Sequence, residues 1–503
     1  MHLVHLQGSR AGAGGGLSPG GCGEATAPRR QGPARQDLGG TGRMAMADAA
    51  ARGALADRAV KAMLAGEIDL VQMEIPDLNG ALRGKFAAAK KVAGGGRSAI
   101  CTVLYQMTPV DDVWESRHSS YDNGFPDVLG VPDLSTAIAL PWRQGMGAVL
   151  YDVVYPDGSP FPLAPRNVLR RVADRFAATG YAPMFGVEYE AFVLHANREM
   201  MQAGRHHDLT SIGRMANAYR LTQADEAREL GAEFIRRMRG IGITVEVFHT
   251  ELGLGAVEFA MAPAGAIEAA DNAIRAKTYF RELCAERGLT ASFMAKWRVG
   301  DSGCGAHIHQ SIWKNGVNVF YDAGTGKLSE VGHRYLAGML AGLSDCGVIF
   351  RPYVNSFRRF NVSAWSPENV SWGYDNRSAA LRVIAYPEPK AYRIEHRVPG
   401  ADANPYLSIA AMLAGGHHGI ANGLVPSAAV AGNALKAPDA QRLAGTLGEA
   451  TEVFERSAFA RDYFGDDFVE HFAASRRVEL QYWNDWLASQ VTSHELIRHF
   501  ETS

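Results

Sequence analysis

Two histidines separated by one residue end a glycine-rich stretch, Gly300-Asp301-Ser302-Gly303-Cys304-Gly305-Ala306-His307-Ile308-His309-Gln310-Ser311. In a strand, side chains at i and i+2 share one face. A neutral imidazole can bind a divalent metal or donate a hydrogen bond to a phosphate oxygen, and glycines let a ligand approach the backbone closely. A polar edge strand with two surface histidines explains the same pattern. This segment alone leaves both interpretations open.

Carboxylates occur in three other segments that resemble strands, 186–194, 249–258 and 393–397. The first is an apolar run of the kind that is normally buried, and a buried carboxylate costs free energy unless it is paired or bound to metal. Each segment could be a solvated strand face. Together with the histidine pair, they favour a functional site. Their glutamates are Glu188, Glu190, Glu251, Glu258 and Glu395.

If these five carboxylates converge, they need cations, because one pair of like charges at ~4 Å costs about 4 kcal/mol at an effective dielectric near 20. Carboxylate-rich ligation with a histidine suits Mg²⁺ or Mn²⁺ better than zinc. Arginines also lie near these segments, and metals with arginines are what phosphoryl transfer needs to stabilise charge. Any single arginine could instead form a surface salt bridge. The six are Arg358, Arg359, Arg377, Arg382, Arg393 and Arg397.

Composition describes a globular protein rather than a membrane or nucleic-acid-binding one. The chain has 503 residues, of which 47% are hydrophobic, and this length allows two domains. Its formal net charge of -2 argues against a nucleic-acid partner. No apolar run approaches the roughly 18 residues of a membrane span. The five cysteines lack metal-site spacing and indicate a reducing, cytoplasmic compartment.

The chain divides into three parts by local pattern. Residues 1–53 are expected to form a disordered, glycine-rich extension, and either Met44 or Met46 could be the true start; a transit peptide is the alternative. Residues 54–160 form a small domain of short strands that opens with a helix over 57–66. Residues 161–503 form a larger domain, with helices predicted over 166–179, 266–287 and 403–421.

From about Leu55 to the C-terminus, the sequence resembles the glutamine synthetase family. The motifs that carry the resemblance, in order, are 186–192, 249–258, 296–311, 355–367, 376–382 and 393–407, the last containing Ala403-Asn404-Pro405-Tyr406-Leu407. The resemblance implies an α+β fold, with an N-terminal β-grasp domain and a catalytic domain built on an antiparallel half-barrel flanked by helices. It also implies ring-shaped homo-oligomers, commonly dodecamers of two hexameric rings, with each active site between neighbouring subunits.

The resemblance also implies roles for individual residues, with ATP and two or more Mg²⁺ or Mn²⁺ ions as cofactors. The ligands of the ion near the acceptor would be Glu190, Glu251 and Glu258. Those of the ion on the ATP phosphates would be Glu188, His307 and Glu395. Nucleotide contacts would come from His309, Ser311, Arg377 and Arg393, and the arginines that grip the transferred phosphate would be Arg377 and Arg382. Glutamate would be held by Gly303, Arg359 and Arg397, with Glu190 and His307.

The sequence departs from the ammonia-using members at the acceptor end. Trp365 occupies the place of the flap glutamate that takes a proton from ammonium, Ser302 replaces an asparagine that binds glutamate, and Ala256 replaces a glutamine. The ammonium-binding aspartate has no clear match, with Asp111 and Asp112 as weak candidates. An indole cannot act as a base, but it can cover an alkyl chain or a cationic amine. Trp365 could alternatively be a core aromatic in a drifted loop.

We therefore predict an ATP-dependent ligase that forms γ-glutamyl phosphate and transfers it to an amine, similar to γ-glutamylpolyamine or γ-glutamylmonoamine synthetases. The main alternative is glutamine synthesis from ammonia. A non-catalytic family member and a two-metal phosphohydrolase on another fold are further alternatives.

Overall fold

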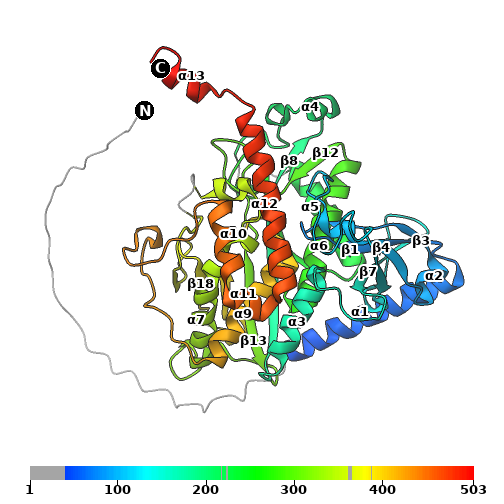
Figure 1. The fold of residues 1–503 in the computed structure, drawn as a ribbon. Coiled ribbons are helices and arrows are strands. Elements are labelled where there is room, and N and C mark those ends of the chain that lie inside the picture. Colours follow the sequence, from blue (N-terminus) through cyan, green and yellow to red (C-terminus); the bar gives the residue numbers. More distant parts are fainter. Residues whose placement is uncertain (1–39, 217, 222–224, 361–364, 387, 503) are drawn as a thin grey trace, which may run out of the picture. The chain divides into compact units, whose positions relative to one another are not determined.

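The computed structural model describes residues 40–216, 218–221, 225–360, 365–386 and 388–502, and these belong to one compact unit (Figure 1). Most of the predicted disordered extension therefore lies outside the described residues. Its last part does not fit the prediction, because helix α1 (Gly40–Ala65) begins well before residue 57. The alanine-rich sequence around 45–56 explains the difference, since alanine has the highest helix propensity.

The first sheet contains seven strands in the order β2-β1-β7-β5-β4, with β3 paired to β1 and β6 paired to β7. Its central strands β1 and β7 run parallel, and the other pairs are antiparallel. These strands are β1 (Leu70–Pro76), β2 (Leu82–Arg83), β3 (Phe86–Ala88), β4 (Ser98–Cys101), β5 (Asp127–Pro132), β6 (Ile138–Ala139) and β7 (Met146–Val154), and the short helices are α2 (Ala89–Ala93) and the 3-10 helix η1 (Thr102–Gln106).

Helix α1 packs on this sheet through an apolar stripe. Ala59 and Met63 share one buried cluster with Val71 of β1 and with Val149 and Tyr151 of β7. The spacing of three to four residues between the buried positions of α1 is that of one helix face. The assignment of this domain as a β-grasp stays a prediction.

The second sheet contains ten strands and forms the centre of the catalytic half of the chain. Its order is β17-β18-β19-β13-β8-β10-β9, with β11 and β12 paired to β8 and β14 paired to β13. All pairs are antiparallel except β17 with β18. The strands are β8 (Ala182–His195), β9 (Val245–Thr250), β10 (Ala256–Met261), β11 (Ala264–Gly265), β12 (Leu289–Ser292), β13 (Ile308–Lys314), β14 (Val317–Asn318), β17 (Trp372–Tyr374), β18 (Leu381–Ile384) and β19 (Arg393–His396), while β15 (Tyr321–Asp322) and β16 (Lys327–Leu328) form a separate pair.

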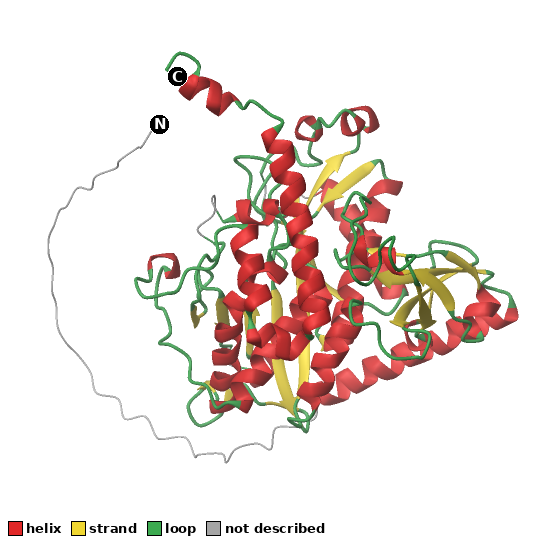
Figure 2. Cartoon of the chain, viewed as in Figure 1, coloured by secondary structure: helices red, strands yellow, loops and turns green. Residues whose placement is uncertain are grey.

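Helices pack against this sheet and against one another (Figures 1 and 2). Phe176, Tyr279, Tyr335 and Tyr406, from α3, α6, α7 and α9, share one buried cluster with Val187 of β8. The helices are α3 (Pro165–Ala177), α4 (Arg198–Gln202), α5 (Asp225–Gly240), α6 (Ala266–Glu286), α7 (Glu330–Asp345), α8 (Gly347–Phe350), α9 (Pro405–Ala421), α10 (Leu447–Arg456), α11 (Ala458–Phe464), α12 (Asp466–Ala488) and α13 (Ser493–His499).

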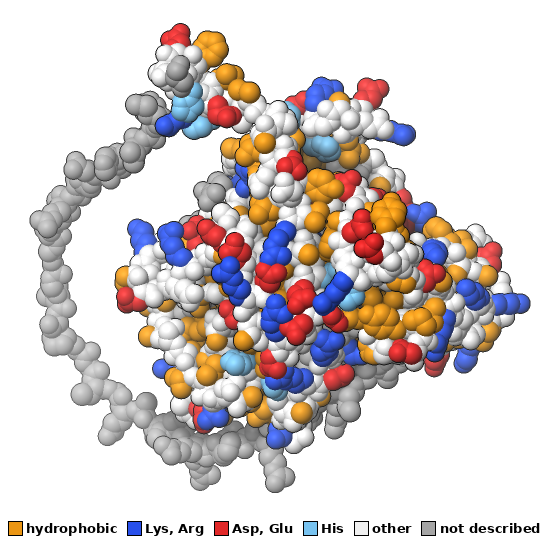
Figure 3. Space-filling view, in the orientation of Figure 1, with side chains coloured by type: hydrophobic (Ala, Val, Ile, Leu, Met, Phe, Trp, Pro, Cys, Tyr) orange, Lys and Arg blue, Asp and Glu red, His pale blue; other side chains and the backbone are white. Residues whose placement is uncertain are grey.

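Three of these helices, α3, α6 and α9, confirm the helices predicted from sequence to within two residues at each end. On the face shown in Figure 3, Lys and Arg side chains are interspersed with Asp and Glu side chains over α10 and α12. None of the helices in the described ranges is long and apolar enough to cross a membrane.

Candidate active site

The register of the second sheet brings five of the predicted site residues, together with His249, into two rows. In the first row, Arg382 on β18 pairs with Glu395 on β19, which pairs with His309 on β13. In the second row, Glu190 on β8 pairs with Glu258 on β10, which pairs with His249 on β9. Because alternate side chains of β8 point to opposite faces, Tyr189 enters the core while Glu188 and Glu190 face the site.

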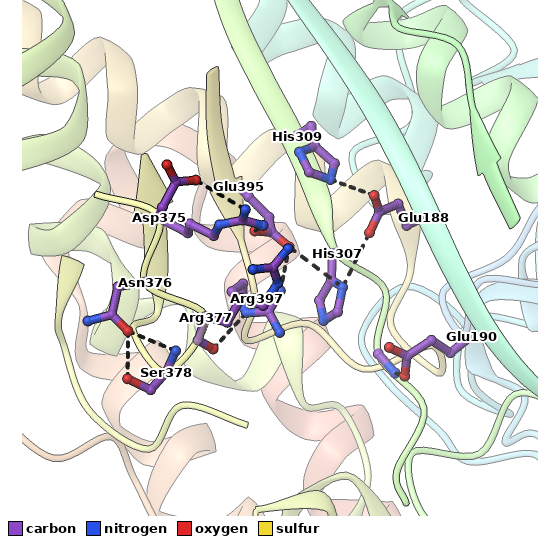
Figure 4. A network of polar contacts seen from close by, with 12 residues as sticks. Glu188, Glu190, His307, His309, Asp375, Asn376, Arg377, Ser378, Glu395 and Arg397 are labelled. Carbon is purple, nitrogen blue, oxygen red and sulfur yellow. Dashed lines mark hydrogen bonds and ion pairs between the residues drawn. The ribbon is translucent and has the colours of Figure 1, made fainter. Parts of the chain in front are cut away.

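Glu395 is the carboxylate of the first row, and it lies among positively charged groups (Figure 4). It is buried, its Oε1 accepts a short hydrogen bond from Arg397, and its Oε2 lies 3.1 Å from a guanidinium nitrogen of Arg382. Burial opposes ionisation, but Arg397, His309 and His307 outweigh it and lower the pKa of Glu395 to about 2. The carboxylate is therefore charged at neutral pH.

Glu188 lies between the two histidines of the glycine-rich stretch (Figure 4). Its Oε1 is 2.8 Å from His309 Nε2, and its Oε2 is 3.4 Å from His307 Nδ1. Arg393 Nε approaches the other ring nitrogen of His309 at 3.1 Å. Burial raises the pKa of Glu188, but the two imidazoles hold that pKa well below its usual range. Both imidazoles therefore contact the same carboxylate.

The second row is less well neutralised. Burial raises the pKa of Glu258, as do the nearby charges of Glu188 and Glu190, and only part of this is offset by His249, whose Nε2 lies 3.1 Å from Glu258 Oε1. A bound cation would stabilise the charged form of such crowded carboxylates. This supports a cation at this end of the site.

Within the described part of the chain, three groups of side chains offer ligand atoms within 4.8 Å of one another. All three are dominated by carboxylate oxygens with one imidazole, which suits Mg²⁺ or Mn²⁺. Six of the predicted site residues thus belong to at least one of these groups, but Glu190, a predicted metal ligand, belongs to none. The groups are Glu188 with His309 and Glu395, Glu188 with Glu258 and His307, and His249 with Glu251 and Glu258.

The predicted glutamate-binding residues surround the loop that precedes β13. Glu190 Oε2 accepts a hydrogen bond of 2.6 Å from the Gly305 amide, and Arg359 approaches His307 Nε2 at 3.4 Å. A side chain at Gly303 would lie 2.6 Å from Arg359 Cγ, so this backbone must pass directly over the arginine. Arg359 is buried and donates to the carbonyl oxygens of Val398 and Pro399.

Three other predicted residues are only partly buried or exposed. Ser311 follows His309 on the same face of β13, and its hydroxyl accepts a hydrogen bond from Trp313. Arg377 is exposed and its carbonyl oxygen accepts a hydrogen bond of 3.0 Å from Arg397 Nε. Trp365 is 53% exposed and directly follows residues 361–364, which lie outside the described part of the chain.

Two residues at the acceptor end were not assigned from sequence. The sequence position of His249 could have indicated it, because it lies two residues before Glu251 and opens the same motif. No such signal marks Tyr219. It reaches the site from an irregular segment, donates a short hydrogen bond to Glu251 Oε2, and lies 4.8 Å from the His249 ring with a positive φ of 61°.

Comparisons with known proteins decide the family. The model of the glutamine synthetase catalytic domain matches residues 162–497. The chain belongs to the glutamine synthetase family. This establishes it as a ligase of that family, and confirms the α+β fold with a glutamine synthetase-type catalytic domain. ATP and divalent metals are typical of glutamine synthetases, and the carboxylate-rich groups fit such ions.

Relatives of this glutamine synthetase family member include amine and ammonia ligases. It is 34% identical to a glutamate–isopropylamine ligase of a Pseudomonas species, over 86% of this chain and 95% of that one. It is 34% identical to a γ-glutamylethanolamide synthetase of Streptomyces coelicolor, over 87% and 94%, and 33% identical to type-1 glutamine synthetase 2 of Dictyostelium discoideum, over 84% and 82%. A solved structure of GmaS with ADP has a TM-score of 0.75 and 27% identity, covering 89% of this chain and 99% of that one.

Proposed function

We propose that this ligase uses ATP to join the γ-carboxylate of glutamate to an amine rather than to ammonia. The observation that carries the proposal is Trp365, an exposed indole at the flap position where ammonia-using members have a glutamate. An indole lacks a basic atom, but it can pack on an alkyl group or lie over a cationic amine for ~0.5 to 2 kcal/mol. Two relatives with amine substrates in their names support this assignment.

The site residues suit a two-step reaction. In the first step, a γ-carboxylate oxygen of glutamate attacks the γ-phosphorus of ATP, and ADP leaves. In the second, the amine nitrogen attacks the carbonyl carbon of γ-glutamyl phosphate, phosphate leaves with the C–O bonding electrons, and a proton is released. We assign the grip on the transferred phosphate to Arg377 and Arg382, and the grip on glutamate to Gly303, Arg359 and Arg397.

Two or more Mg²⁺ or Mn²⁺ ions, when bound, would supply positive charge for the phosphates and the acyl group. We assign one ion to Glu188, His307 and Glu395, and another to Glu190, Glu251 and Glu258. Arg382 and Arg397 already lie against Glu395, so the charges that would face the phosphates are held in place before ATP binds. His309, Ser311 and Arg393 are assigned to the nucleotide.

The test of the proposed function is a substrate panel. Purified protein is given glutamate, ATP and Mg²⁺ with ammonia, short monoamines, ethanolamine or polyamines, and ADP release is followed together with the mass of the product. We expect the highest kcat/KM with an amine. Best turnover with ammonia would instead support glutamine synthesis, the alternative favoured by the likeness to the Dictyostelium enzyme.

The substitution Trp365→Glu tests the role of the flap residue directly. A carboxylate at this position can take the ammonium proton but no longer covers an alkyl group, so we expect the ratio of kcat/KM for ammonia to that for the best amine to rise by about tenfold or more. Trp365→Phe is the matched control, because it keeps an apolar ring and should keep the amine preference. An unchanged ratio in Trp365→Glu would show that this residue does not determine the choice between amine and ammonia.

We also propose that the protein acts in the cytoplasm as a homo-oligomer, a dodecamer of two hexameric rings. The family assignment supports the ring assembly. Mass photometry of the purified protein measures the number of subunits directly, and a monomer at working concentration would contradict this proposal.

A further inference from the structure

Ser302 occupies the position at which an asparagine holds glutamate in the ammonia-using members, but its hydroxyl points elsewhere. The Ser302 Oγ donates a short hydrogen bond to the carbonyl oxygen of Leu252, 50 residues away in sequence. Leu252 directly follows Glu251, one of the three carboxylates assigned to the acceptor end. The hydroxyl therefore joins the loop before β13 to the loop between β9 and β10.

We infer that Ser302 is a positioning residue for Glu251 and the acceptor end of the site, rather than a contact to glutamate. This inference rests on the proposed function for the identity of the acceptor, but not for the arrangement of the two loops.

The Leu252 backbone is held on both of its polar groups. Its N–H donates to Glu251 Oε1 at 3.0 Å, and its carbonyl oxygen accepts from Ser302. The other carboxylate oxygen of Glu251 accepts from Tyr219, and the Glu251 amide donates to the Ala256 carbonyl at 2.9 Å. Without the Ser302 hydroxyl, the Leu252 carbonyl oxygen loses its hydrogen bond. The N–H of the same residue orients the Glu251 carboxylate, so the position of that carboxylate becomes less well fixed.

The two loops also approach each other closely at Gly253. Gly253 has a φ of 126°, a conformation that favours glycine, and a Cβ there would lie 2.9 Å from Ser302 Oγ and 2.8 Å from the Phe192 ring. The two loops are therefore in direct contact at this point.

Glutamate binding does not need Ser302 in this arrangement. The neighbouring Gly303 lies against Arg359, and Gly305 donates to Glu190, so the predicted contacts to glutamate are fixed by the other side of the same loop. Ser302 and Gly303 consequently serve different substrates, although they are adjacent in sequence.

The decisive measurement is the separate KM for each substrate in Ser302→Ala. The net value of one hydrogen bond, about 0.5 to 1.5 kcal/mol, corresponds to a two- to twelvefold effect. We expect the KM of the acceptor to rise within this range, together with the Mg²⁺ concentration that gives half the maximal rate, while the KM of glutamate stays within about twofold. Ser302→Thr keeps the hydroxyl and should restore the wild-type KM.

Ser292→Ala provides a matched control, since it removes a hydroxyl that accepts a hydrogen bond from the Met294 amide on the adjoining segment. It should leave all three constants unchanged. A higher KM for glutamate in Ser302→Ala would overturn the inference, because it would identify Ser302 as a glutamate contact. Unchanged constants, or an equal loss for both substrates with a lower melting temperature, would also overturn it.

Each variant is measured with the best amine and with ammonia. If ammonia proves to be the better acceptor, the proposed amine specificity fails, but the acceptor KM of Ser302→Ala still tests the positioning role. The two failures are therefore distinguishable.

Discussion

At the scale of single residues, Glu395 is a buried carboxylate that lies between two buried arginines. It lies 3.1 Å from Arg382 and in short contact with Arg397, and the exposed fractions of the three residues are only 2%, 7% and 5%. Removing one partner from a buried ion pair typically costs about 3 to 5 kcal/mol, because the other charge stays buried without compensation. We expect Glu395→Gln to lower the free energy of unfolding by several kcal/mol and the ligase rate by about a hundredfold or more.

Calorimetry and the rate of ADP release measure the two effects. Asp375→Asn is the control, because Asp375 contacts the same Arg382 at 3.1 Å but is more than half exposed, so its ion pair is worth about 1 kcal/mol or less. Equal effects of the two substitutions would contradict the special position of Glu395.

The difference between residues that sequence patterns predicted and those they missed has a physical basis. Glu188 was predicted because carboxylates in an apolar, strand-like run need partners, and the structure brings it together with Glu258 and His307. Tyr219 could not be found in this way. Its position depends on a left-handed backbone and a hydrogen bond from its amide to the Thr250 carbonyl, neither of which leaves a periodic pattern.

At the scale of elements, strand faces were predictable but strand partners were not. The i and i+2 spacing of Glu188 and Glu190 indicates one shared face, whereas the row of Arg382, Glu395 and His309 depends on the register of three strands far apart in sequence. The family resemblance implies separate roles for His307 and His309, and both imidazoles contact Glu188.

A buried histidine, His471, connects helix α12 to the N-terminal domain and makes the stability of the protein depend on pH. His471 Nε2 lies 2.9 Å from the Tyr105 carbonyl oxygen in η1. Burial lowers the pKa of His471 to about 4; the Tyr105 carbonyl opposes this shift, while His118, Arg117 and Arg476 add to it. In the unfolded chain, His471 therefore takes up a proton as the pH falls through about 6.5, whereas in the folded chain it stays neutral until the pH approaches 4. Stability contributed by the neutral ring is complete above pH 6.5 and is lost as the pH falls towards 4.

We expect the wild type to lose about 1 to 2 kcal/mol through this group between pH 7 and pH 5. His471→Gln keeps a donor for the Tyr105 carbonyl but cannot titrate, so its melting temperature should fall less steeply over the same range. The exposed His494 of α13 gives the control His494→Gln, which should follow the wild-type slope. Parallel slopes for all three proteins would contradict the role of His471.

At the scale of the whole molecule, the N-terminal boundary of the folded chain can be decided by truncation. The described contacts of α1 begin at Arg52, which pairs with Glu268 at 2.7 Å, and continue through the buried side chains of Ala56, Ala59 and Met63. A protein that starts at Met46 keeps all of them. We propose that the folded chain needs no residue before this point, and expect a Met46 start to leave the melting temperature and the ligase rate unchanged.

A protein that starts at Gly66 loses the whole apolar stripe of α1 and exposes the cluster around Val71 and Val149. Burial of a large apolar side chain such as Met63 contributes about 1.5 to 3 kcal/mol and each buried alanine less, so the loss is comparable with the lower end of the roughly 5 to 15 kcal/mol by which domains are usually stable. We expect this second protein to aggregate or to melt well below the first. Thermal melting and ADP release are compared for both at equal concentration. If the Met46 start also lost activity while keeping its melting temperature, residues 1–45 would have a role in the reaction, and the proposed boundary would be wrong.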